Sequence, residues 1–202
     1  MRSPIKLSYL DCEELLTQIE QLESKYEQKN LKIPKALGGD YAEFKVLSML
    51  LKKGFPVEHV GGGYAYDILL KPDIKIEIKY SRKQKGATGG AYWEWSKIDP
   101  DKFKYLVLVG EDEDHTCKFF IFDSEESKKH IPPVAYNYKP EEHRRSVKIF
   151  ESKESWKNYV QKWNPHEEHT RRYKEQTSNE DSSEGFINTH IDCFENKWEK
   201  IK

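Results

Sequence analysis

The segment from residue 65 to residue 80, AYDILLKPDIKIEIKY, constrains the fold most strongly. Residues 74–80 alternate strictly, with Ile74, Ile76 and Ile78 on one face and Lys75, Glu77 and Lys79 on the other. This period of two predicts a strand with one buried face and one polar face. Residues 65–70 form another apolar run, and only the turn Lys71-Pro72-Asp73 separates the two. So short a turn predicts an antiparallel hairpin, in which position 67 lies opposite roughly position 77.

Helices and further strands are predicted on both sides of this hairpin. Residues 9–30 read as an amphipathic helix, with Asp11 as its N-cap and Glu14 as the capping-box partner. Residues 39–53, which begin with Gly39-Asp40, predict a second helix, and Gly54 follows as its C-cap. Further strands are predicted over residues 55–60, 91–98, 103–110 and 117–123, and a further helix from about residue 152. We therefore expect an α/β fold, with a mixed β-sheet flanked by helices.

Composition favours one core domain with polar extensions. The chain has 202 residues, of which 36% are hydrophobic and 34% are charged, so its core is thin for its length. We expect the core over residues 36–150 and an N-terminal helical extension over residues 1–35. Residues 151–202 would form a helical C-terminal extension, which is partly flexible because residues 176–185 are almost entirely polar.

The sequence favours a cytoplasmic protein. No apolar run approaches the roughly 20 residues that would span a membrane, and the N-terminus lacks the apolar region of a signal peptide. The three cysteines are far apart and odd in number, which indicates a reducing compartment.

Charged side chains converge on the predicted hairpin. Asp67 lies opposite Glu77, and Lys79 projects from the same strand face as Glu77. On the preceding helix, Glu43 lies on the same side as the apolar Leu47. A carboxylate on an inward helix face is costly unless it has a partner. Carboxylates that hold a divalent metal, with a lysine beside them, supply what phosphodiester hydrolysis needs.

This order of elements resembles the PD-(D/E)xK nuclease superfamily, which includes restriction endonucleases and archaeal Holliday junction resolvases. The resemblance covers about residues 38–125. Within it, LGGDYAEFKVLSMLLKKG is similar to the first core helix of the family, and AYDILLKPDIKIEIKYSR is similar to its catalytic hairpin. The resemblance implies a restriction-endonuclease-like core.

The resemblance also implies roles for single residues. Asp67 and Glu77 would be metal ligands, with the main-chain carbonyl of Ile78 as a third. Lys79 would be the catalytic lysine, and Glu43 would be the auxiliary helix acid, acting through a water or a second metal. The expected metal is magnesium, for which manganese would substitute.

The lysine- and glycine-rich segment of residues 81–90, SRKQKGATGG, is expected to form a loop that faces double-stranded DNA. Arg82, Lys83 and Lys85 would contact phosphates, which position a protein without specifying sequence. Gln84 is the candidate for reading a base edge. The net charge of −1 argues mildly against non-specific coating of nucleic acid and against a broad surface that reads DNA shape.

The expected function is that of a magnesium-dependent endonuclease that hydrolyses DNA, with a type II restriction endonuclease as the leading subtype. Symmetric cutting of two strands usually needs two active sites, so a homodimer is expected. Two alternatives stay open. One is a Holliday junction resolvase or DNA repair nuclease of the same fold, and the other is a non-catalytic DNA-binding module.

Each feature also has a simpler interpretation. A Glu-x-Lys pattern on an exposed strand is commonly a solvated face with cross-strand ion pairs. The pair Pro72-Asp73 looks like the motif that names the family, but Asp73 falls in the turn, so Asp67 is preferred. Trp93 and Trp95 share one strand face and are expected in the core rather than stacked on bases.

The C-terminal region holds a pattern with metal-ligand spacing, His166-x2-His169 followed by His190-x2-Cys193. Two pairs with two-residue spacers resemble a zinc site. Three histidines with one cysteine are an uncommon ligand set, however, so solvated histidines are favoured.

Overall fold

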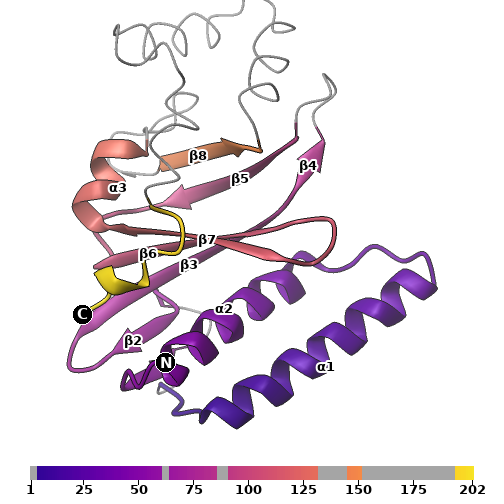
Figure 1. Ribbon diagram of the computed structural model, residues 1–202, viewed down its shortest axis with the longest axis horizontal. Coiled ribbons are helices and arrows are strands. Elements are labelled where there is room, and N and C mark those ends of the chain that lie inside the picture. The colour runs from indigo at the N-terminus through magenta and orange to yellow at the C-terminus, as the bar shows by residue number, and fades with distance from the viewer. Residues whose placement is uncertain (1–3, 61–63, 86–90, 132–144, 152–193) are drawn as a thin grey trace, which may run out of the picture.

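A computed structural model describes residues 4–60, 64–85, 91–131, 145–151 and 194–202. Its centre is a five-stranded sheet in the order β1-β2-β3-β6-β7, in which β3 and β6 are parallel and the other pairs are antiparallel. The strands are β1 (Val57–His59), β2 (Ile68–Leu70), β3 (Ile74–Arg82), β6 (Tyr105–Glu111) and β7 (Cys117–Asp123). Two helices, α1 (Tyr9–Gln28) and α2 (Lys35–Lys52), lie on one side of this sheet (Figure 1). The expected α/β class, with a mixed sheet flanked by helices, is confirmed.

The predicted hairpin is present in the predicted register. Ile68 pairs with Ile76, and the amide of Asp67 donates to the carbonyl of Ile76 at 3.0 Å. Position 67 therefore lies opposite position 77, as the turn length predicted. Ile68 and Ile76 are fully buried, together with Leu47 of α2. Burial of these side chains sets which hairpin face turns towards α2 and which turns away.

The first N-terminal helix begins at Tyr9 as predicted but has a different N-cap, and the second begins earlier than predicted. Ser8, in an extended conformation, is the N-cap of α1, and its hydroxyl accepts a hydrogen bond from the amide of Asp11 at 3.2 Å. The Asp11 carboxylate in turn accepts from the amide of Ser8 at 2.7 Å, so Asp11 is the capping-box partner and its prediction as N-cap is wrong. The second helix begins at Lys35 rather than at Gly39-Asp40. Pro34 precedes it as N-cap, a place where the missing N–H of proline costs nothing.

A second, three-stranded sheet in the order β4-β5-β8 packs on the other side of the central sheet (Figure 1). Its strands are β4 (Gln84–Lys85), β5 (Ala91–Ile98) and β8 (Arg145–Phe150). The prediction of one loop over residues 81–90 is therefore wrong for residues 81–85. Trp93 and Trp95 are buried between the sheets, and their indole N–H groups donate to main-chain carbonyls at 3.0 and 3.2 Å. Their prediction as core residues is confirmed.

The end of the chain returns to the core. Trp198, in the short 3₁₀ helix η4 (Trp198–Lys200), and Ile201 are buried in the same cluster as Leu47. Phe194 stacks on Phe122 of β7 with 4.3 Å between ring centroids.

A short helix, α3 (Ser124–His130), follows β7 and was not predicted. The predicted helix from residue 152 and the His/Cys pattern of residues 166–193 lie outside the described residues. None of the helices described is long and apolar enough to span a membrane.

The two adjacent glycines of α2 give a test of how closely this helix packs on the sheet. A Cβ atom at Gly38 would lie 2.2 Å from the Tyr80 ring, whereas one at Gly39 would meet nothing within 4 Å. Gly38→Ala should therefore destabilise the protein by about 1–3 kcal/mol despite the better helix propensity of alanine. Gly39→Ala should stabilise it by up to about 1 kcal/mol. Urea unfolding measures both, and equal effects would show that α2 does not pack on Tyr80 as described.

Candidate active site

Asp67 lies where β2 and β3 begin to separate. Its carboxylate Oδ2 accepts a hydrogen bond from the amide of Ile78 at 2.7 Å. The Asp67 side chain, rather than the β2 main chain, thus accepts the hydrogen bond of the Ile78 amide on the edge of β3 that faces β2. Because the N–H and C=O of one strand residue point to the same side, the carbonyl of Ile78 faces the Asp67 side as well. The two oxygen donors that the resemblance implies therefore share one edge of β3.

Glu77 and Lys79 are neighbours on one face of β3, two residues apart, and they form an ion pair. Their side chains are 12% and 28% exposed. Both project from the face opposite to that of Ile76 and Ile78, which pack beneath α2. The structure therefore brings together Asp67, Glu77 and Lys79, as the hairpin register predicted.

Glu43 reaches the same region from α2. Its Oε2 lies 2.7 Å from Nε2 of His59 on β1, and the two side chains are 22% and 12% exposed. Glu43 is close enough to Asp67 and Glu77 to raise the pKa of both. Sequence reasoning missed His59. The signal was available, because His59 shares a strand face with Val57, which is buried.

Like charge and burial perturb the acids of this site. Burial raises the pKa of Asp67 to about 7, and the Glu77 and Glu43 carboxylates add to the increase. Burial also raises the pKa of Glu77, although the neighbouring Lys79 acts in the opposite direction. Perturbed carboxyl groups that gather at one place are typical of functional sites, although structural ion-pair networks show them too.

The donor set suits a hard divalent cation. Three carboxylates and one main-chain carbonyl are oxygen ligands, which magnesium prefers. A divalent cation would also relieve the mutual repulsion of the acids. The carboxylate oxygens of Asp67, Glu77 and Glu43 do not all lie within 4.8 Å of one another. In the described part of the chain, only Glu23, Glu111 and His115 form a group with ligand atoms that close together.

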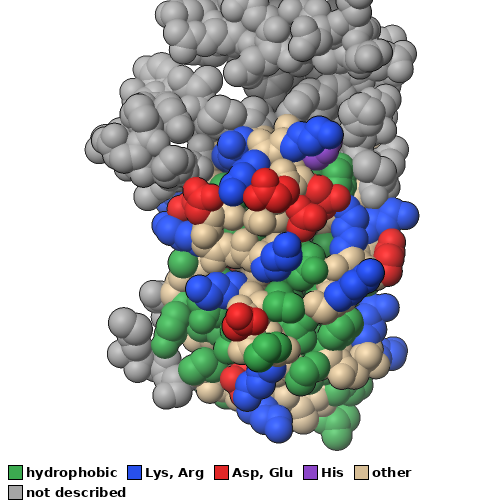
Figure 2. All heavy atoms as spheres, turned by 90° about the vertical axis from the view of Figure 1, so that its left-hand side faces the viewer, with side chains coloured by type: hydrophobic (Ala, Val, Ile, Leu, Met, Phe, Trp, Pro, Cys, Tyr) green, Lys and Arg blue, Asp and Glu red, His purple; other side chains and the backbone are tan. Residues whose placement is uncertain are grey.

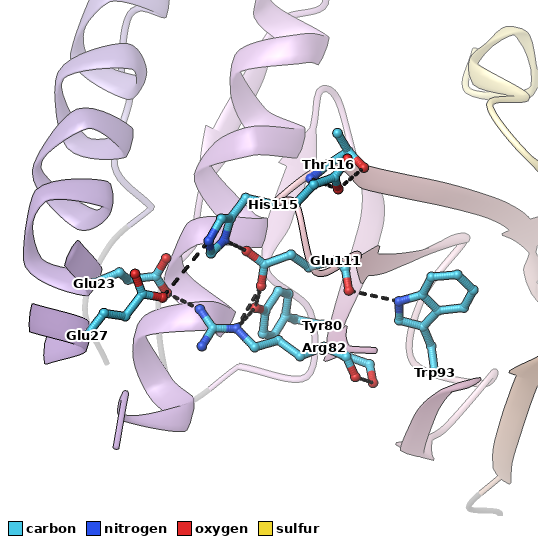
Figure 3. Close-up of polar contacts among 10 residues, drawn as sticks. Glu23, Glu27, Tyr80, Arg82, Trp93, Glu111, His115 and Thr116 are labelled. Carbon is cyan, nitrogen blue, oxygen red and sulfur yellow. Dashed lines mark hydrogen bonds and ion pairs between the residues drawn. The ribbon is translucent and has the colours of Figure 1, made fainter. Parts of the chain in front are cut away.

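That tighter group already contains a cation of the protein itself. Arg82 donates from Nη2 to Glu23 at 2.6 Å and from Nε to Glu111 at 2.7 Å (Figure 3). Glu111 also accepts hydrogen bonds from Tyr80 and from Nδ1 of His115, the latter at 2.8 Å. Glu23 comes from α1, Arg82 from β3 and Glu111 from β6. The network therefore ties the N-terminal helix to the central sheet, and its buried charges are balanced by an arginine.

The four predicted DNA contacts differ in how they are placed. The carboxylates of Glu23 and Glu111 engage Arg82, and Lys83 is only 12% exposed, with ion pairs to Asp112 and Glu151. Gln84 is exposed. The Lys85 side chain is 73% exposed and pairs with Glu113 at 2.8 Å. A role for Arg82 and Lys83 in binding phosphate would require them to leave these partners, and DNA contact by all four residues stays a prediction.

The charge on the surface is mixed. On the face drawn in Figure 2, lysine and arginine side chains are interspersed with acidic ones, above a more hydrophobic area. This face does not present one uniformly basic surface, in keeping with the net charge of −1.

No family model matches the chain, and no curated protein matches its sequence.

Asp67→Asn should stabilise the metal-free protein at neutral pH. Asparagine keeps an oxygen that accepts from the Ile78 amide and removes a charge that burial disfavours. Because the pKa of Asp67 rises from 3.8 to about 7 on folding, the folded state binds more protons than the unfolded state across that window. The free energy of unfolding of the wild type therefore falls as pH rises from about 4 to about 7.

The variant should exceed the wild type in stability by about 1–3 kcal/mol at pH 8 and match it near pH 4. Urea unfolding in the presence of a chelator measures this difference at each pH. A difference that does not change with pH would contradict the raised pKa.

Arg82→Ala should destabilise the fold, because Glu23 and Glu111 would be left buried without their cation. We expect a loss of about 1–3 kcal/mol in the free energy of unfolding. Lys85→Ala, which removes an exposed ion pair on the edge strand β4, should change it by less than about 0.5 kcal/mol. Urea unfolding of both variants tests whether Arg82 anchors α1, and equal losses would argue against that role.

Proposed function

We propose that this protein is a metal-dependent endonuclease that hydrolyses phosphodiester bonds of DNA. The observation that carries the proposal is the Asp67 carboxylate, which is held opposite Glu77 by the hairpin register, with Lys79 beside it. An ordinary solvated strand face does not explain this arrangement well. Burial raises the pKa of both acids, and Glu43 approaches them from a separate helix.

The residues of the site have distinct tasks in such a reaction. Asp67, Glu77 and the carbonyl of Ile78 would hold magnesium, or manganese in its place. When bound, that cation lowers the pKa of a water ligand and offsets negative charge on the phosphate. The hydrogen bond from the Ile78 amide keeps Asp67 oriented towards the edge where the carbonyl lies. Glu43 would orient a water on the side of α2.

Besides the metal ion, the Lys79 side chain would supply positive charge to the site. Its ammonium group pairs with Glu77, and the Lys79 side chain is 28% exposed, which leaves it accessible to a substrate phosphate. From this position it would orient the attacking water and stabilise the charge that develops on the phosphate oxygens. Its contact with Glu77 links this cation to the acids that hold the metal.

The same proposal includes the substrate and the subtype. Double-stranded DNA is the proposed substrate, and a type II restriction endonuclease acting as a homodimer is the leading subtype. Mixed surface charge and the ion pairs of Arg82 and Lys83 support local recognition more than a broad surface that reads DNA shape.

Incubation of the purified protein with supercoiled plasmid and magnesium tests the activity. We expect cleavage that a chelator abolishes, with discrete fragments from a restriction enzyme. Asp67→Ala and Lys79→Ala should each lower the cleavage rate at least about 100-fold, because each removes a group that acts on the reacting atoms.

Matched controls come from the same hairpin. Asp73→Ala removes the acid of the turn, and Lys75→Ala removes an exposed lysine of β3. Both should cleave at the wild-type rate. Normal cleavage by either Asp67→Ala or Lys79→Ala would overturn the site, and absence of cleavage on linear, supercoiled and branched DNA would overturn the activity.

A further inference from the structure

His59 is held firmly in the structure by its backbone. It is the last residue of β1 and pairs with Ile68 of β2. On its other side, His59 exchanges two main-chain hydrogen bonds with Ile5, at 2.7 and 2.9 Å. The N-terminal segment thus extends the sheet at this one point. A residue fixed from both sides offers its side chain in a defined place.

The imidazole of His59 is directed at Glu43. Nε2 lies 2.7 Å from Oε2 of Glu43, and the ring packs against Phe44 with 5.2 Å between centroids. Only 12% of the His59 side chain is exposed. Packing on Phe44 and a fixed backbone leave the ring little freedom, so the hydrogen bond restricts Glu43 in turn.

Glu43 needs such a restraint if it acts on the candidate site. A glutamate side chain has three rotatable bonds, and fixing them costs up to about 1.5–2 kcal/mol of conformational entropy. The acids Asp67 and Glu77 lie near enough to Glu43 for their negative charges to repel it. Without a partner, Glu43 would turn away from them towards solvent.

We propose that His59 is a positioning residue, which holds one carboxylate oxygen of Glu43 so that the other stays directed at the site of Asp67 and Glu77. This assignment rests on the proposed function. Groups behind metal ligands and catalytic acids commonly act in this way, and their loss typically costs 10–100-fold in metal affinity or activity. The competing role is that of a purely structural contact between α2 and β1.

Two conservative variants separate these roles. The amide nitrogen of glutamine can occupy the place of Nε2, whereas that of asparagine reaches only the place of Nδ1. His59→Gln should therefore keep the contact with Glu43, and His59→Asn should lose it while remaining polar. Lys71→Ala serves as the matched control, because it removes a contact to another glutamate, Glu58 of β1, outside the candidate site.

The readouts are Mn²⁺ affinity by electron paramagnetic resonance without DNA, kcat and KM for plasmid cleavage, and the melting temperature. We expect His59→Asn to weaken Mn²⁺ binding or lower kcat by about 10-fold or more, with KM for DNA within about twofold. His59→Gln should stay within about threefold of the wild type, and Lys71→Ala should bind Mn²⁺ normally.

Several outcomes would overturn the assignment. One is a His59→Asn variant that melts at a lower temperature yet keeps the Mn²⁺ affinity and kcat of the wild type. Another is a His59→Gln variant as impaired as His59→Asn. Asp67→Ala, measured in parallel, distinguishes failure of the His59 assignment from failure of the proposed function. If Asp67→Ala abolishes Mn²⁺ binding and His59→Asn does not alter it or kcat, only the assignment fails. If the wild type binds no Mn²⁺, the proposed function fails with it.

Discussion

The antiparallel register between β2 and β3 is the constraint on which the candidate site depends. Ile68 opposite Ile76 places Asp67 opposite Glu77. A shift of one residue would turn the polar side chains into the core beneath α2 and expose both isoleucines. Because these isoleucines are fully buried, such a shift would cost several kcal/mol of hydrophobic stabilisation. Apolar packing on one face of the hairpin therefore maintains the arrangement of charges on the other.

Those charges are kept at an energetic cost. Asp67 satisfies the Ile78 amide, yet burial and the neighbouring carboxylates make its ionised form unfavourable and raise its pKa to about 7. Lys79 offsets the charge of Glu77 only in part, since the pKa of Glu77 is raised as well. Residues that oppose stability in this way are expected where function requires them. In the role proposed for His59, its contact with Glu43 opposes the same repulsion.

A few residues further along β3, charge has the opposite effect. Arg82 connects Glu23 of α1 with Glu111 of β6, and the arginine balances acids that would otherwise be costly to bury. The strand thus carries an acid of the candidate site in its middle. At its end it carries an ionic network that stabilises the fold, and Figure 3 shows that network. The N-terminal helix is joined to the candidate site through this strand.

The sequence by itself determined the hairpin, its register and the set Asp67, Glu77 and Lys79, because a strand period and a short turn are local properties. It also indicated that Glu43 faces inward, from helical spacing alone. Only the tertiary structure decided what depends on distant pairing. The segment after β3 became β4 because β5 pairs with it, and β5 pairs with β8 about fifty residues later in the chain. His59 contacts Glu43, and Arg82 contacts two glutamates rather than solvent. Strand alternation can indicate that a side chain such as His59 faces inward, but only the packing of separate elements decides which partner it contacts.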